Sequence, residues 1–204
     1  MNAKGKKSLK RLAFAVTIIL GLVGCAKETM ATFVDANAVD EGLEYYIRID
    51  KGVYDLGEAI EALCRVTNVG IESLNVVKID LRYTVHFELE TPKGDILIAP
   101  LIPIPLPGFP DIITLNAGEY MERRYNITSL TWGLDGQAFD EPFTIFGQYS
   151  IISEYDNNWP GAEGPLTLEP DALDFEIIPE PASIALLGLG LASLLVRKKG
   201  RAKC

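Results

Sequence analysis

Two loops rich in acidic and amide side chains are the parts of this sequence best suited to hold a ligand. The first carries Asp135 and Asp140, and the second carries Asp156 and Asn158. Carboxylate and amide oxygens are the ligands that calcium takes in extracellular proteins. Asp and Asn are also ordinary turn formers in β-proteins, and neither loop follows the EF-hand pattern. The four residues are therefore candidate calcium ligands, with turn formation as the alternative.

A tryptophan lies beside each acidic loop: Trp132 precedes the first, and Trp159 is part of the second. An aromatic ring at the end of a β-domain can stack on a sugar ring, and tryptophan also serves as an anchor in protein cores. Trp132 and Trp159 are therefore candidate ligand-binding residues, although core or edge packing is the more common role of a tryptophan.

Residues suited to catalysis are scarce. The sequence has a single histidine, His86, and contains no GxSxG, HExxH, CxxC or phosphate-loop pattern. Cys64 falls on the apolar face of a predicted strand, where a thiol packs as a small hydrophobe. A glycosidase needs only a pair of carboxylates, but nothing in the sequence pairs two of them. We therefore predict a protein that is not an enzyme and uses no cofactor.

Charge is distributed unevenly along the chain. Residues 29–179 carry 8 Lys and Arg against 26 Asp and Glu, a net charge of −18, so the cations are concentrated in the two ends. A strongly acidic surface repels nucleic acid, which we exclude as a partner. On the same ground, an acidic polysaccharide is expected to need bridging cations.

Hydrophobic periodicity predicts strands between the two ends. At residues 77–89 every odd position is apolar or aromatic and every even position is polar, as is typical of a strand with one buried face. Further strands are predicted at 58–67, 120–127, 143–155 and 173–177. Several short strands separated by turn residues favour an all-β fold, an antiparallel β-sandwich over residues 32–178.

A proline-rich segment at 99–110 interrupts this pattern. Prolines at alternate positions favour polyproline II and exclude a central strand. The segment is predicted to be a connection over the sandwich edge, with an exposed hydrophobic arm for a partner as the alternative.

The N-terminus has the parts of a secretory signal peptide, predicted over residues 1–31. Several cations precede an apolar run from Leu12 to Val23. Residues 22–25 resemble a lipobox, in which Cys25 would be lipidated. Cleavage by signal peptidase after Ala26 or Ala31 is the alternative.

The C-terminus, residues 179–204, resembles the PEP-CTERM sorting signal. It consists of a motif at 179–183 (Pro179, Glu180 and Pro181), an uncharged apolar segment at 184–196, and a basic tail at 197–204. The apolar segment is predicted to be a single transmembrane helix with the tail in the cytoplasm, although it is shorter than the ~20 residues usual for a span. A simple tail anchor is the alternative.

The resemblance implies a route for the protein. In that family the signal holds an exported protein in the inner membrane until an exosortase cuts near the tripeptide. It therefore implies an inner-membrane protein with a periplasmic domain, released to the cell surface or extracellular matrix after processing by exosortase and signal peptidase. The expected role is structural or adhesive within an exopolysaccharide layer. The alternative is a ligand-binding module, such as a carbohydrate binder or protease inhibitor.

A second resemblance concerns the body. Residues 54–60 and 66–68 look like the opening strands of immunoglobulin-like or fibronectin-like modules. Residues 147–151 resemble a late strand of such folds, where a tyrosine near the strand start bonds back to the backbone. The paired cysteines of a true immunoglobulin domain are lacking. This resemblance implies architecture only.

Overall fold

The computed structural model describes residues 32–100, 108–139, 141–162 and 166–180. Residues 31–178 form one compact unit. Its regular elements are strands, apart from one turn of 3-10 helix, η1 (Ile127–Ser129), so the all-β prediction is confirmed. The strands are β1 (Val34–Asp40), β2 (Leu43–Ile49), β3 (Val53–Asp55), β4 (Glu61–Asn68), β5 (Leu74–Val77), β6 (Val85–Glu90), β7 (Ile96–Ala99), β8 (Ile112–Leu115), β9 (Tyr120–Asn126), β10 (Trp132–Leu134), β11 (Gln137–Phe139), β12 (Gly147–Asp156), β13 (Thr167–Leu168) and β14 (Leu173–Ile178).

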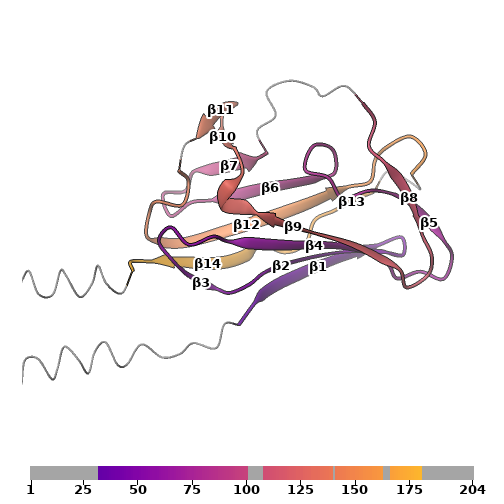
Figure 1. The fold of residues 1–204 in the computed structure, drawn as a ribbon, viewed down its shortest axis with the longest axis horizontal. Helices are drawn as coiled ribbons and strands as arrows, with labels where there is room; N and C mark the ends of the chain where they lie inside the picture. Colours follow the sequence, from indigo (N-terminus) through magenta and orange to yellow (C-terminus); the bar gives the residue numbers. More distant parts are fainter. Residues whose placement is uncertain (1–31, 101–107, 140, 163–165, 181–204) are drawn as a thin grey trace, which may run out of the picture. The chain divides into compact units, whose positions relative to one another are not determined.

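The strands form two main sheets and a small third one (Figure 1). One main sheet has the order β1-β2-β4-β9, and the other runs β11-β10-β7-β6-β12-β14-β3 with β13 beside β12. Strands β5 and β8 pair separately. Neighbours are antiparallel except β14 and β3, which are parallel. The fold is sandwich-like, and an immunoglobulin-like topology is not confirmed.

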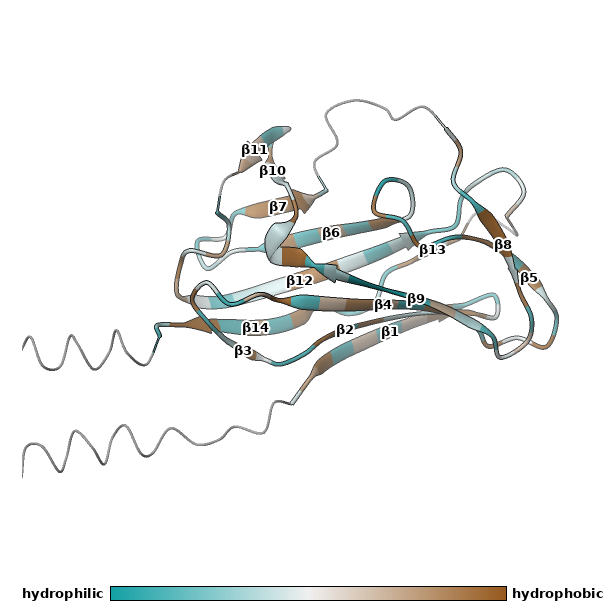
Figure 2. Cartoon of the chain, viewed as in Figure 1, coloured by the Kyte–Doolittle hydropathy of each residue, from teal (hydrophilic) through white to brown (hydrophobic). Residues whose placement is uncertain are grey.

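Aromatic side chains join the two main sheets through one core. Tyr45 on β2 packs against Tyr155 on β12, with ring centroids 5.6 Å apart. The Tyr45 hydroxyl also shares a 2.6 Å hydrogen bond with the Ser153 hydroxyl, which belongs to the opposite sheet. Alternation places these side chains inward, and in Figure 2 apolar and polar residues succeed one another along β4 and β14.

Most predicted strands are present. Residues 120–127 correspond to β9, 173–177 to β14, and 58–67 to β4 with a later start. The strand predicted from residue 143 begins only at Gly147. The residues directly before it bond to the Tyr149 side chain. The Tyr149 hydroxyl donates to the Ile145 carbonyl at 2.8 Å. This is the backward tyrosine bond that the sequence resemblance implied.

The prediction of a single long strand at 77–89 is wrong. The chain leaves β5 at Val77, makes a turn, and enters β6, which lies in a different sheet. Asp80 makes that turn. Its carbonyl accepts from the amides of Tyr83 and Thr84, and its side chain accepts from the amide of Arg82 at 2.8 Å. A local Asx turn therefore overrides an alternation that extends across it.

Several predicted features lie outside the described residues: the signal peptide with Cys25, the apolar segment 184–196, the basic tail 197–204, and positions 101–107 of the proline-rich connection. Across the described ranges, no helix has the length and apolar character needed to cross a bilayer.

Asn68, at the end of β4, is a buried polar residue that organises one end of the body. Its side-chain amide donates to the carbonyls of Glu72 and Leu115 at 2.7 and 2.9 Å. Its side-chain oxygen accepts from the Gly70 amide at 2.9 Å. These bonds satisfy backbone groups that two loops leave without strand partners.

Replacing Asn68 should therefore destabilise the protein. Asn68→Ala is expected to lower the free energy of unfolding by about 2–4 kcal/mol, because buried backbone groups lose their partners. Urea unfolding of the full chain in detergent measures the change. Asn75→Ala, which removes an exposed amide bonded to Thr114, should cost no more than about 0.5 kcal/mol. Equal losses in both variants would contradict this role.

Candidate functional site

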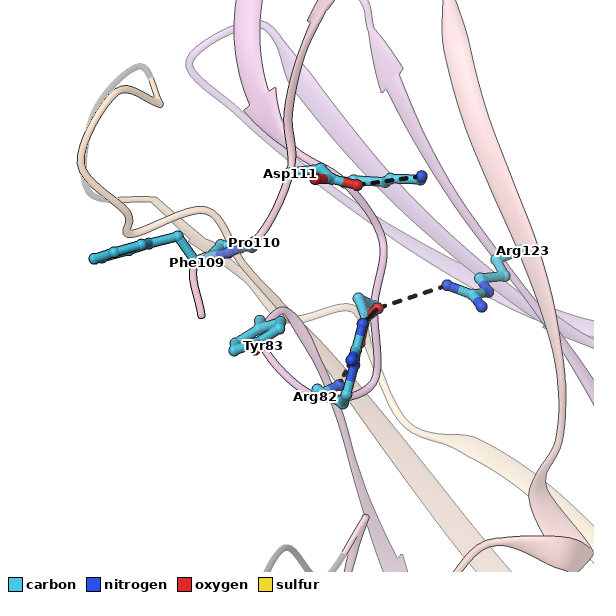
Figure 3. Close-up of a pocket in the computed structure, with 8 residues that line it drawn as sticks. Arg82, Tyr83, Phe109, Pro110, Asp111 and Arg123 are labelled. Atoms are coloured by element: carbon cyan, nitrogen blue, oxygen red, sulfur yellow. Dashed lines mark hydrogen bonds and ion pairs between the residues drawn. The ribbon is translucent and has the colours of Figure 1, made fainter. Parts of the chain in front are cut away.

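A surface cleft of about 260 Å³ lies where three segments of the body meet. One is the turn between β5 and β6, the second is the stretch leading into β8, and the third is strand β9. The lining residues are Lys78, Asp80, Arg82, Tyr83, Phe109, Pro110, Asp111 and Arg123. Figure 3 shows them with Tyr83 and Phe109 on one flank and Arg123 on the other.

The Asp80 carboxylate brings two guanidinium groups together. The Nε and Nη2 atoms of Arg82 donate to its two oxygens, both at 2.9 Å. Nη1 of Arg123 lies 3.8 Å from the same carboxylate and donates to the Ile79 carbonyl at 3.2 Å. The hydrogen bond from Arg82 is the main reason that the pKa of Asp80 is below its usual value. Asp80 is therefore a fixed anion that orients two cations.

A third cation, Lys78, lines the cleft beside Asp111, which Figure 3 labels at its upper edge. The Lys78 ammonium is 3.5 Å from the Asp111 carboxylate, and both side chains are largely exposed. A backbone bond from the Lys78 amide to the Asp111 carbonyl, at 2.8 Å, holds the two segments together. Exposed pairs of this kind contribute little to stability. The ammonium is thus available to a ligand.

Aromatic rings form the other flank. The Arg82 guanidinium lies 5.4 Å from the Tyr83 ring centroid, a cation–π distance. Phe109 is 84% exposed, which is unusual for so large an apolar side chain. Trp159 packs edge-on against Tyr83, with centroids 5.7 Å apart.

The two predicted tryptophans lie in different environments. Trp132 is fully buried, and its indole N–H donates to the Ile127 carbonyl at 3.0 Å. Its prediction as a surface ligand residue is corrected, because it packs as a core anchor against Phe143. Trp159 is partly exposed and supports the cleft through Tyr83.

The candidate calcium ligands act as turn residues where they are described. Asp135 lies in the tip of the β10–β11 hairpin with a φ of 51°. Asp156 accepts from the Asn158 amide at 2.8 Å, an Asx turn. Asp140 lies outside the described residues. Within the described ranges, no three acidic, His or Cys side chains gather as a metal site would require.

Two further residues lie as the sequence predicted. Cys64 is fully buried, and burial raises the pKa of its thiol to about 12, which makes it a poor nucleophile. His86 lies on the outward face of β6, opposite Glu154 on β12.

The sorting residues Pro179 and Glu180 directly follow β14, and Pro181 lies outside the described residues.

Sequence reasoning did not find the cleft. Alternation assigned Lys78, Asp80 and Arg82 to the solvated face of one strand, where they would be ordinary surface charges. Only the tertiary structure adds Arg123 from β9 and Phe109 from the segment before β8. The available signal was the Asp-x-Arg spacing at a charged turn.

The PEP-CTERM protein-sorting motif matches residues 178–199 of this chain. The search of curated proteins found no match to this chain. Among solved structures, the chain is similar to a β-glucosidase from Listeria innocua crystallised with isofagomine, at 11% identity and a TM-score of 0.31. That alignment covers 72% of this chain and 16% of the other. At this level, the similarity informs neither fold nor function.

The geometry predicts that Asp80 stabilises the body by its charge as well as by its turn. Asp80→Asn keeps the turn but removes the charge, and Asp80→Ala removes both. At neutral pH we expect the stability order wild type, Asn, Ala, with a total loss of about 1–2 kcal/mol for Ala, measured by urea unfolding.

The pH dependence tests the origin of that loss. Because the folded-state pKa is lowered, the contribution is complete above the unfolded-state pKa and disappears as the pH falls through the folded-state value. Wild type and Asp80→Asn should therefore converge in acid. A constant difference at all pH values would contradict an electrostatic role.

Proposed function

We propose that this protein is an exported, non-catalytic component of the cell envelope or extracellular matrix, with a structural or adhesive role in an exopolysaccharide layer. The observation that carries the proposal is the sorting motif at residues 178–199, which begins where the last strand ends. The motif suggests export, membrane-associated sorting and processing by an exosortase. The scarcity of catalytic groups in the sequence supports a non-catalytic role.

The body's topology supports attachment at one end. Val34 opens β1 and Ile178 closes β14. Val34 lies beside Gly52, and Ile178 pairs with Asp55 three residues further along the chain. The Gly52 carbonyl accepts from the Glu176 amide at 2.9 Å, and a Cβ added to Gly52 would meet the Val34 side chain at 3.3 Å. Both connections to the targeting segments therefore leave the body at the same end.

The sorting motif follows the body closely in sequence. Five residues, 179–183, separate the end of β14 from the apolar segment predicted at 184–196.

A second candidate function is ligand binding, and the position of the cleft favours it. Val85 and Asp156 lie at the opposite end of the large sheet from Gly147 and Ile177. The β5–β6 turn that carries Asp80 to Tyr83 leads into Val85. Most of the cleft therefore lies at the end of the large sheet opposite to Ile177, near the end of β14.

The sorting motif can be tested in the native host. Replacing Pro179, Glu180 and Pro181 together by alanine should leave a full-length chain in the membrane fraction, while the wild type loses the residues after the motif. Intact-mass analysis of membrane and medium measures this, with Asp171→Ala, on an exposed loop, as the control. A wild-type chain that stays full-length and membrane-bound would favour a simple anchor. A reporter inside the body that is active only in the cytosol would contradict export itself.

A further inference from the structure

We propose that the cleft around Asp80 binds a carboxylate-bearing sugar, such as a uronate unit of an anionic polysaccharide. This rests on the proposed role as an exported ligand-binding component and names the ligand class. It also revises, for this one location, the expectation that acidic polysaccharide needs bridging cations.

The charge distribution supports an anionic ligand. Three of the eight Lys and Arg in residues 29–179 line this cleft (Lys78, Arg82 and Arg123), against only two carboxylates. The acidic remainder of the body repels a polyanion at long range, but physiological salt screens such repulsion beyond about 8 Å. A ligand seated in the cleft therefore meets a local excess of positive charge.

The guanidinium groups retain donors for a carboxylate. Arg82 uses Nε and Nη2 on Asp80, and Arg123 uses Nη1 on the Ile79 carbonyl. Nη1 of Arg82 makes no hydrogen bond within the described residues. The Arg123 guanidinium also lies 5.7 Å from the Tyr125 ring centroid, so Arg82 is the better placed of the two donors. Because Asp80 already holds Arg82 by two bonds, and the Ile79 carbonyl holds Arg123 by one, a ligand carboxylate would bind with a reduced loss of side-chain freedom.

The aromatic flank supports a sugar as the carrier of that carboxylate. Tyr83 and the exposed Phe109 offer ring surfaces beside the cations. The apolar C–H face of a pyranose packs on such rings while its carboxylate reaches a guanidinium. At about 260 Å³ the cleft is also smaller than the roughly 300–1,000 Å³ of ordinary ligand pockets, which suits a sugar unit better than a folded peptide.

The experiment is calorimetric titration of the full-length chain, purified in detergent, with tri-galacturonate. We expect saturable binding that the methyl-esterified trisaccharide loses, because esterification keeps the rings and removes the charge. Arg82→Ala and Tyr83→Ala should each weaken binding by about tenfold or more. Arg82→Lys, which keeps the charge but not the fork, should fall between wild type and alanine.

The chain offers matched controls on β4 and β9 that do not line the cleft. Arg65 is paired with Glu122 and lies 4.8 Å from the ring centroid of Tyr120, the same combination of groups at a different place. Arg65→Ala and Tyr120→Ala should change the affinity by less than about twofold.

Three results would overturn the proposal. The first is that tri-galacturonate does not bind, and the second is that the Arg65 and Arg82 variants weaken binding equally. The third is that hexaglutamate binds as tightly as tri-galacturonate, which would assign the cleft to acidic peptides. Titration of the purified chain does not depend on export or cleavage. Failure here therefore leaves the sorting proposal standing, and failure of sorting leaves this result interpretable.

Discussion

The pairing of Asp80 with Arg82 is the interaction on which the cleft depends. The same carboxylate accepts from the Arg82 amide and from its guanidinium, so one side chain both turns the backbone and positions a cation. The turn ends the path from β5 and begins β6, which places the two strands in different sheets. Without it, residues 77–89 could continue as a single strand, and Arg123 on β9 would lack the anion that it faces.

The sandwich-like body provides the rigid support for this turn. Tyr45 and Ser153 join the two sheets by a hydrogen bond between buried hydroxyls, and burial raises the pKa of Tyr45 well above its usual value. Tyr155 donates to the Val77 carbonyl, and Asn157 accepts from the Val77 amide at 2.8 Å. The last residue of β5 is therefore bound by Tyr155 on the long strand β12 and by Asn157 directly after it. These bonds from the core fix the position of Val77, which directly precedes the cleft residue Lys78.

Sequence reasoning succeeded where one local pattern decides the structure. Alternation on β4 and β14 placed those two strands, and the burial of Cys64 followed from its position on an apolar face. It failed where polar side chains compete with the strand, as at Asp80. The sequence left the role of Trp132 open between ligand binding and core packing, because nearness to a polar loop in sequence does not report the direction of a side chain. The cleft could not be predicted, since its residues come from three segments that only long-range pairing brings together.

The most direct test of the account is whether a sugar carboxylate reaches the guanidinium groups that Asp80 orients. Nitrogen-15 labelling of arginine allows the Nε–H resonances to be followed by NMR during titration with tri-galacturonate. The account predicts that the signals of Arg82 and Arg123 move on saturation while that of Arg65 stays in place. Equal movement of all three, or movement of Arg65 alone, would contradict it.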